Sequence, residues 1–366
     1  MYIERKGLPA DQFDRFEFNA ILRSWYAVHH RPLLWRNTTD PYKIWLSEII
    51  LQQTRVAQGA PYYVKFLENY PTVFDLAAAD ERDVLRLWQG LGYYSRARNM
   101  HFTARQIVSE FEGKFPDSAH RLAKLKGLGH YTAAAIASFA FQEVVPAIDG
   151  NVYRVLARLF GIFTDILSNE GKKEFLSLAS QVISREDPAT YNQAMIEFGA
   201  LQCVPAAPDC SVCPFSYMCY AHRFNMQDKL PVKTKKAAVR NRFFNYIVLQ
   251  NGYNIAMRER LGKDIWKGLY DFHLIESPGS DLTPDELAKD VYFNQWALEG
   301  QLREVGKVYT HLLTHQRLHI RFWCVILSKN AKVLLPENMR FYSPNEIETL
   351  PKPIVIDQLL REENFL

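Results

Sequence analysis

The sequence lacks the features that mark membrane, secreted and disordered proteins. No apolar run among its 366 residues approaches the roughly 18 that a membrane-spanning helix needs. The first residues, Met1 to Arg5, lack the basic-then-apolar layout of a signal peptide. Hydrophobic residues make up 48% of the chain and no low-complexity stretch or repeat is evident, which excludes a disordered or fibrous protein. We therefore expect a cytoplasmic protein with well-packed cores and no membrane partner.

A strong excess of one charge is also absent. The 44 Lys and Arg residues against 40 Asp and Glu residues give a net charge of +4. Such mild basicity is compatible with a polyanionic partner but does not by itself establish one.

Cysteine is scarce, and four of the five cysteines lie within seventeen residues. Cys203, Cys210, Cys213 and Cys219 have the spacing C-x6-C-x2-C-x5-C. In a reducing cytosol such a cluster is typical of a metal site rather than of disulfides. Four thiolates hold either zinc or a [4Fe–4S] cluster, and the spacing alone leaves both open. Cys324 lies in an apolar run and is predicted to be a buried strand residue.

Two domains of different character are predicted. Residues 1–224 have helical periodicity, and Asp40 with Pro41 predicts an N-cap and a first helical position. A basic stretch follows, and we expect residues 225–242 to be an interdomain linker. Residues 243–366 are expected to form an α+β domain. The predicted helices are 41–54, 94–112, 151–160, 170–184 and 283–298, and the predicted strands are 243–250, 253–260, 270–275 and 318–327.

A glycine-rich turn and two carboxylates stand out in the helical half. Gly127 and Gly129 predict a hairpin between two helices, whose backbone N–H groups could bind a phosphate, although a helix C-cap followed by a turn has the same pattern. Glu48 lies in the most apolar predicted helix. Its carboxyl is either solvated at the edge of the apolar face or partly buried with a raised pKa. Asp149 precedes a predicted helix and could simply cap it. Two carboxylates in contrasting environments can also run glycosidic chemistry.

Several long strings carry a resemblance to a known family. They are Leu33–Arg36, Pro41–Thr54, Gly90–Asn99 and Ile148–Val152, together with the cysteine cluster. Combined with the hairpin, they resemble the endonuclease III superfamily of DNA glycosylases and, within it, the MutY family of adenine glycosylases. The resemblance covers roughly residues 15–222 and is weaker beyond. It implies an all-α helix-hairpin-helix glycosylase domain with a [4Fe–4S] loop at 203–219, followed by an α+β Nudix-like domain at 243–366.

The resemblance also implies a reaction and its partner. The partner is double-stranded DNA with adenine opposite 8-oxoguanine or guanine, and the adenine is excised after it is flipped out. Glu48 is implied to protonate the purine and Asp149 to stabilise or bond to the sugar cation, with Tyr131 and Asn151 assisting around the sugar. We expect a monomer associated with the nucleoid.

Further binding roles follow from the same resemblance. Arg31, Trp35 and Glu197 match positions that line the adenine pocket. Gln53 and Tyr93 match residues that wedge into the base stack beside the lesion. The other implied contacts are a backbone clamp at Gly127 and Gly129, lesion reading by Leu313, Thr314 and His315, and a [4Fe–4S] cluster on Cys203, Cys210, Cys213 and Cys219.

The chain departs from related sequences at two places, and these departures argue against lyase activity and against pyrophosphohydrolysis. Bifunctional lyases of the superfamily carry a lysine where this chain has Tyr131, and a phenol cannot form a Schiff base, so a mainly monofunctional enzyme is expected. No Nudix box occurs in residues 243–366, so the Nudix-like fold is expected without pyrophosphohydrolysis. Two alternatives are a pyrimidine-specific glycosylase with lyase activity and a non-catalytic, metal-stabilised DNA-binding module.

Overall fold

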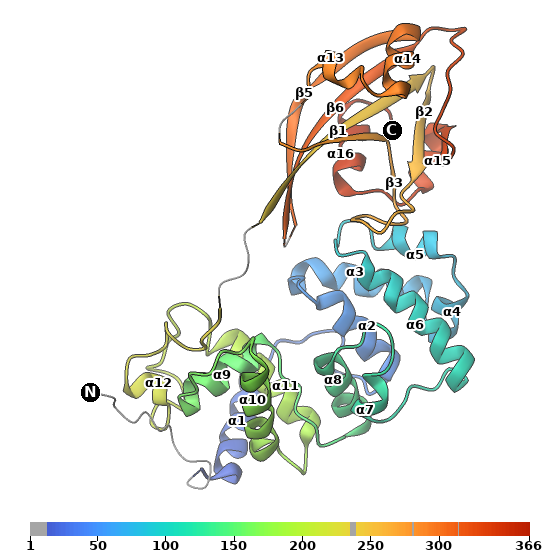
Figure 1. Cartoon of the computed structure of the whole chain (residues 1–366). Helices are drawn as coiled ribbons and strands as arrows, with labels where there is room; N and C mark the ends of the chain where they lie inside the picture. The colour runs from blue at the N-terminus through green and yellow to red at the C-terminus, as the bar shows by residue number, and fades with distance from the viewer. Residues whose placement is uncertain (1–12, 235–238, 280–281, 314) are drawn as a thin grey trace. The chain divides into compact units, whose positions relative to one another are not determined.

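The computed structural model describes residues 13–234, 239–279, 282–313 and 315–366 (Figure 1). The chain divides into two compact units. The first comprises Met1–Ala78 and Asn99–Lys235, and the second comprises Ala79–Arg98 and Lys236–Leu366. A segment from the helical half of the sequence thus packs with the carboxy-terminal part of the chain.

The first unit is helical, as the sequence predicts. Its helices are α1 (Arg15–His29), α2 (Pro41–Leu51), α3 (Val56–Asn69), α4 (Val73–Ala78), most of α6 (Ser95–Phe111), α7 (Ala119–Leu122), α8 (His130–Phe141), α9 (Gly150–Phe160), α10 (Asn169–Val182), α11 (Pro188–Leu201) and α12 (Tyr220–Arg223). Helix α11 packs against α1, α8 and α9, and α8 packs against α2 and α7. These pairings bring residues from α2, α8, α9 and α11 toward one place.

Local sequence explains where the main helices begin. The Asp40 side chain accepts a hydrogen bond from Tyr42 N at 2.9 Å and Pro41 is the first residue of α2, which confirms both predictions. Asp149 caps α9 in the same way, accepting from Asn151 N at 2.8 Å and Val152 N at 2.9 Å. A capping oxygen satisfies amides that have no partner inside the helix, so each Asp fixes a helix start.

The second unit is built on a mixed sheet with strand order β3-β2-β1-β6-β5 (Figure 1). Strand β4 also pairs with β1, and β7 with β2; the β1–β6 pair is parallel, and the other pairs are antiparallel. The strands are β1 (Arg240–Asn251), β2 (Asn254–Glu259), β3 (Tyr270–Asp271), β4 (His273–Ser277), β5 (Gly300–Leu312), β6 (Gln316–Leu327) and β7 (Met339–Tyr342). The helices are α5 (Glu81–Leu87), α13 (Pro284–Leu287), α14 (Val291–Glu299), α15 (Pro344–Thr349) and α16 (Ile354–Glu362).

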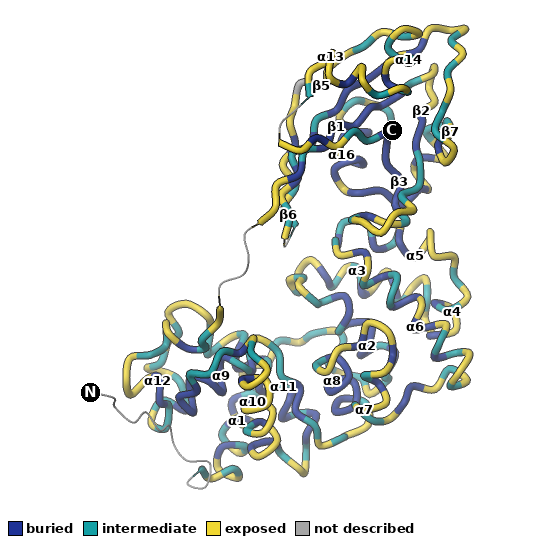
Figure 2. The backbone as a smooth tube through the Cα atoms, in the orientation of Figure 1, coloured by how far each residue is buried: buried dark blue, intermediate teal, exposed yellow. Residues whose placement is uncertain are grey.

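Strand β1 is the centre of this sheet. Its residues Tyr246, Ile247, Val248 and Leu249 are all fully buried, so both faces of the strand are covered (Figure 2). Helix α14 packs against β5 and β6 on one face. Cys324, on β6, is also fully buried, which confirms its predicted place in a strand.

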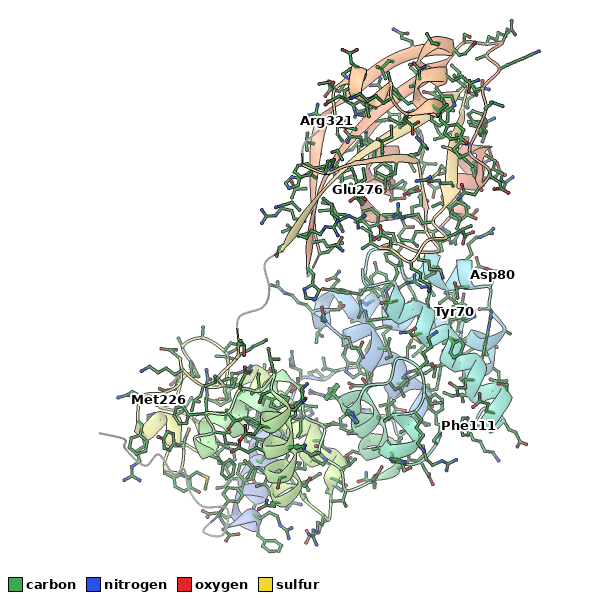
Figure 3. The ribbon with its side chains drawn as sticks, viewed as in Figure 1. Tyr70, Asp80, Phe111, Met226, Glu276 and Arg321 are labelled. Carbon is green, nitrogen blue, oxygen red and sulfur yellow. The ribbon has the colours of Figure 1, made fainter. Side chains whose placement is uncertain are left out.

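Parts of the segment predicted as a linker, residues 225–242, belong to the two folded units. Leu230 is 2% exposed and belongs to the core of the helical unit. At the other end, β1 already begins at Arg240. Arg242 is buried between Asp264 and Glu276, which is labelled in Figure 3, with guanidinium–carboxylate distances of 2.9 and 2.7 Å. Basic composition predicted a linker here, but an ion-paired arginine can be part of a strand.

Two local predictions differ from the structure. The predicted helix at 283–298 is two helices, because the Thr283 side chain caps α13 and Asp290 caps a new start at α14. Strand β5 was not predicted. Within the described residues it pairs only with β6, and it carries exposed charges such as Arg303. Its register also shifts between Val305 and Tyr309, and both features hide the alternating pattern of a strand.

Among the described residues, no helix is both long enough and apolar enough to span a bilayer.

Candidate active site

A cavity of about 470 Å³ lies inside the helical unit. Eight residues singled out from the sequence line it. They are Arg31, Trp35, Glu48, Gln53, Tyr131, Asp149, Asn151 and Glu197. The structure therefore brings together in one chamber side chains that are up to 166 positions apart in the sequence, which periodicity could not show.

Glu48 lies on α2, an apolar helix of this unit, with Ile49 and Ile50 buried beside it. The pKa of its carboxyl is raised to about 7: burial raises it most, the hydrogen bond with Tyr131 lowers it, and the negative charge of Asp149 raises it. A carboxyl that is half protonated near neutral pH suits a general acid. The Glu48 side chain is partly exposed to the cavity, so its proton is accessible to a bound base.

Asp149 is held in a different way. One carboxylate oxygen accepts the two amides at the start of α9, and the other accepts from the Asn151 side chain at 2.7 Å. Burial raises the pKa of Asp149, while these hydrogen bonds oppose the shift. Hydrogen bonds of this kind favour the ionised form and fix the carboxylate in place. The cap predicted from the sequence and the proposed catalytic carboxylate are therefore the same side chain.

Tyr131 is the second residue of α8 and lines the same cavity as the two carboxylates. Its hydroxyl is hydrogen-bonded to Glu48, and burial followed by the charges of Glu48 and Asp149 raises its pKa well above the ordinary value. A phenol with a raised pKa stays protonated and acts as a hydrogen-bond donor. Tyr131 can therefore orient the Glu48 carboxyl without competing with it as an acid.

Glu197 has a third environment. Its fully buried carboxylate accepts from the Arg31 backbone and side chain and from both terminal nitrogens of Arg36, at 2.5–2.9 Å. Burial would raise its pKa, but the hydrogen bonds from Arg31 and Arg36 outweigh burial and hold it at about 2. Glu197 is thus permanently ionised and saturated with donors, so it cannot transfer a proton near neutral pH. It fixes the two arginines at the cavity wall.

Arg154 connects this site to the cysteine loop. Its guanidinium donates to Asn151 Oδ1 at 2.8 Å, to the Gly199 carbonyl at 2.6 Å and to the Cys203 carbonyl at 2.7 Å. The Asn151 amide is therefore fixed between Arg154 and Asp149. Neither Arg36 nor Arg154 was predicted from the sequence as a site residue. An arginine among the inward-facing positions of α9 was the available signal for Arg154.

The predicted hairpin is present, and its second helix, α8, begins at His130. Gly127 has φ +81°, and a Cβ there would lie 2.7 Å from the Asn99 Cβ, so both conformation and space require glycine. Gly129 precedes α8 without a side-chain cap bond in the described chain, and a Cβ there would meet nothing within 4 Å. The start of α8 therefore has open space at Gly129 and no side-chain cap, which is compatible with an anion site.

The remaining predicted contacts lie in the second unit. Tyr93 is 43% exposed and has φ +49°, which is unusual for a non-glycine residue. Leu313 and His315 belong to the turn that joins β5 to β6, where Leu313 N donates to the Gln316 carbonyl at 2.8 Å and the His315 carbonyl accepts from Arg240 N at 3.0 Å. Thr314 lies outside the described residues.

The four clustered cysteines line one small cavity beside α9. Arg158 donates to Cys203 Sγ at 3.4 Å and Gln227 to Cys210 Sγ at 3.8 Å. Within the described chain, no three His, Cys, Asp or Glu side chains converge as ligands of a single ion. The four cysteines therefore surround a common space.

Comparisons with known proteins agree with this architecture. Residues 46–181 match the family described as HhH-GPD superfamily base excision DNA repair protein, and residues 245–362 match the NUDIX domain. The adenine DNA glycosylase of Buchnera aphidicola subsp. Baizongia pistaciae (strain Bp) is 36% identical over 351 residues, covering 94% of this chain and 95% of that relative.

A second relative and a solved structure are also similar. The adenine DNA glycosylase of Buchnera aphidicola subsp. Schizaphis graminum (strain Sg) is 31% identical over 306 residues, 83% of this chain and 86% of that relative. The structure of a thermostable thymine-DNA glycosylase has a TM-score of 0.54 at 26% identity and covers 57% of this chain and 97% of that one.

Proposed function

The chain belongs to the adenine DNA glycosylases, base excision repair enzymes that act on DNA, and we propose that it removes adenine paired with 8-oxoguanine or guanine. In this proposal Glu48 is the general acid and Asp149 stabilises or bonds to the sugar cation. The observation that carries the assignment is the contrast in one cavity between Glu48, with a pKa of about 7, and Asp149, held by three hydrogen bonds.

The bond changes follow from these environments. Glu48 transfers its proton to a ring nitrogen of the flipped adenine, and the bond between that base and the sugar C1′ breaks with its electron pair leaving on the base. The cation that develops on the sugar is stabilised by the Asp149 carboxylate, which Asn151 orients. Water then adds to C1′, and its proton passes to solvent or to the Glu48 carboxylate. The products are free adenine and an abasic site.

The neighbouring groups support binding and not proton transfer. Arg31 and Arg36 are fixed by Glu197, so their guanidinium groups keep one orientation at the cavity wall. Trp35, which packs edge-on against Tyr63 with ring centroids 5.4 Å apart, offers an aromatic surface to a planar base. We propose that these residues hold the flipped adenine, that the Gly127–Gly129 hairpin binds the DNA backbone, and that Gln53 and Tyr93 wedge between bases.

We further propose that the turn at 313–315 reads the lesion opposite the adenine. His315 is exposed at the tip of the β5–β6 hairpin, where its imidazole can reach a base. We also propose a monomeric enzyme, mainly monofunctional because Tyr131 provides no amine, that works in the cytoplasm near the nucleoid.

The cysteine loop fits a [4Fe–4S] cluster. Such a cluster takes four thiolate ligands, and all four clustered cysteines line one small cavity. The resemblance to glycosylases that carry this cluster favours it over zinc. Cys203, Cys210, Cys213 and Cys219 would hold it, and when bound it would fix the shape of the loop.

One assay tests the proposal against both alternatives. The purified chain is incubated with duplexes that carry adenine opposite 8-oxoguanine, adenine opposite guanine, or an oxidised pyrimidine, and the products are analysed before and after alkali. We expect adenine release and alkali-dependent strand cleavage on the first two duplexes. Cleavage only of the pyrimidine duplex, without alkali, would indicate the lyase alternative, and binding without base release would indicate a non-catalytic module.

A further inference from the structure

The exposed Tyr93 lies in a turn that is held by hydrogen bonds from the neighbouring residues Trp88 and Tyr94. Gly90 and Gly92 have positive φ angles, and Tyr93 itself adopts φ +49°. Trp88 Nε1 donates to the Gly92 carbonyl at 3.0 Å, and the Tyr94 hydroxyl accepts from Gly90 N at 3.4 Å. A non-glycine residue in this conformation costs free energy, so it persists only where its surroundings determine it.

The same turn is bound to a distant segment of its own unit. The Tyr94 hydroxyl donates to the Lys352 carbonyl at 3.3 Å, and Lys352 N donates to the Gln89 side-chain oxygen at 3.1 Å. The side chains of Gln89 and Tyr94, which lie on either side of the turn, therefore bind the N–H and the carbonyl of Lys352. These bonds join positions 258 and 263 apart in sequence.

Lys352 is a rigid anchor. It lies between Pro351 and Pro353, so it carries the one amide N–H of this tripeptide, and the flanking prolines restrict its backbone. Its side chain is 2% exposed and donates to the carbonyls of Ile347 at 2.7 Å and Leu350 at 3.1 Å. The Pro351 carbonyl accepts from Tyr270 N at 2.8 Å, which ties the segment to the sheet.

Further contacts flank this anchor. Arg98 donates to the Lys267 carbonyl at 2.6 Å, and the Arg82 guanidinium lies 5.7 Å from the centre of the Tyr270 ring. Gly268 has φ +78°, and a Cβ there would lie 3.0 Å from Leu85 Cδ1. The whole segment Ala79–Arg98 is accordingly part of the second compact unit.

We infer that Gln89 and Tyr94 are positioning residues through which the carboxy-terminal unit, by way of Lys352, holds Tyr93 in its exposed conformation for insertion into DNA. The inference rests on the proposed function, in which Tyr93 contacts the base stack. It assigns the carboxy-terminal unit a second task besides lesion reading, because the unit that carries the 313–315 turn also supports the wedge.

The test is a double-mutant cycle on the full-length protein. Affinity is measured for a duplex that holds a non-cleavable adenosine analogue opposite 8-oxoguanine, with wild type, Tyr93→Ala, Tyr94→Phe and the double variant. Tyr93→Ala should weaken binding by about five- to 150-fold, as loss of aromatic stacking on a base does. Tyr94→Phe should weaken it by about two- to tenfold, as loss of one hydrogen bond does. In the Tyr93→Ala background, Tyr94→Phe should have no further effect, because it acts only through Tyr93.

Gln89 supplies an independent arm. Gln89→Leu removes the acceptor for Lys352 N and should behave like Tyr94→Phe, whereas Gln89→Glu keeps an acceptor oxygen and should restore affinity. If Tyr94→Phe does not fold, the two Gln89 variants test by themselves whether Lys352 positions Tyr93. The matched control is Tyr42→Phe, because the buried Tyr42 hydroxyl also donates to a main-chain carbonyl, that of Tyr70 at 2.6 Å, but in the helical unit. Its effect should be the same with and without Tyr93.

Each contrary result has a distinct meaning. Equal losses from Tyr94→Phe in both backgrounds, or no loss from either Tyr94→Phe or Gln89→Leu, would overturn the inference. An unchanged affinity in Tyr93→Ala would overturn it together with the wedge role. Adenine excision by the wild type, measured in parallel, shows separately whether the proposed function stands.

Discussion

Arg154 and Asn151 are joined by a hydrogen bond of 2.8 Å from the guanidinium to the side-chain carbonyl oxygen. This bond leaves the Asn151 amide pointing at Asp149, to which it donates at 2.7 Å. Because the same guanidinium also holds the Cys203 carbonyl, the proposed cluster loop and the proposed sugar-stabilising carboxylate share one cation. The state of the loop should therefore influence excision.

The first prediction concerns Arg154→Met. The change leaves the carbonyls of Cys203 and Gly199 without their charged donor and allows the Asn151 amide to rotate. We expect the single-turnover excision rate to fall about tenfold or more, since charged hydrogen bonds are worth about 1.5–3 kcal/mol. Iron content should fall as well. Arg154→Lys, which retains the charge, should lie between this variant and the wild type; a full rate in Arg154→Met would show that Asn151 needs no support.

The second prediction is a pH dependence set by Glu48. The acid form of Glu48 is required, and its pKa is about 7, so the excision rate should be highest below that pH and fall as pH rises through it. Glu48→Gln should lower the rate by about 10² to 10⁴ while duplex affinity stays near that of the wild type. Single-turnover rates between pH 5 and 9 check this. A rate within threefold of wild type in Glu48→Gln would remove Glu48 from the mechanism.

Glu48→Gln, which should lower the excision rate, should raise the free energy of unfolding. Because the folded-state pKa of Glu48 is raised above its ordinary value of 4.5, ionisation favours unfolding. The wild type should lose stability as pH rises from about 4.5 to about 7, and the loss should then be constant. Glu48→Gln removes this penalty, so it should be more stable than wild type by on the order of 1–3 kcal/mol at pH 8, and equally stable below pH 4. Thermal unfolding at both pH values measures the difference.

The third prediction is that Tyr131→Lys gains lyase activity. Tyr131 lines the cavity with Asp149, so an amine at this position would face the sugar C1′. We expect strand cleavage without alkali and a covalent adduct that borohydride traps. Tyr131→Phe is the control, because it has no nucleophile. Adenine release by Tyr131→Lys without any trapped adduct would show that position 131 does not face the sugar.

The fourth prediction concerns the metal. The protein should be brown as purified, with iron and sulfide each near four per chain when the cluster is fully loaded. Cys213→Ser should reduce both and destabilise the loop, whereas Cys324→Ser, outside the cluster in β6, should leave the iron content unchanged. A colourless protein with stoichiometric zinc would contradict the iron–sulfur assignment without affecting the glycosylase family.

The fifth prediction separates lesion reading from general DNA binding. His315→Ala should narrow the preference for 8-oxoguanine over guanine opposite adenine, since a side-chain contact to a base is worth about 1–3 kcal/mol. Lys229→Ala, in the basic stretch that precedes β1, should weaken binding to both duplexes alike and reduce the salt dependence. Rates and affinities on the two duplexes give the ratio. Equal losses on both duplexes in His315→Ala would make His315 an ordinary surface histidine.

Local sequence determined much of the fold. Asp40 with Pro41 started α2, Asp149 started α9, and the Gly127–Gly129 turn separated two helices, because capping and positive φ angles depend on a few neighbouring residues. The same reasoning missed β5, whose exposed charges hide its pattern, and merged α13 with α14 across the cap at Asp290.

The sequence by itself determined which residues are present for chemistry: the carboxylates, the tyrosine of the hairpin and the four thiols. Only the tertiary structure decided how they differ. Glu48 and Glu197 are both glutamates on apolar helices, yet burial raises the pKa of one to about 7 while two arginines hold the other at about 2. Those arginines lie 161 and 166 positions from Glu197, and Lys352 lies 263 from Gln89. Charge state and positioning depend on neighbours that are distant in the chain, so no local pattern could predict them.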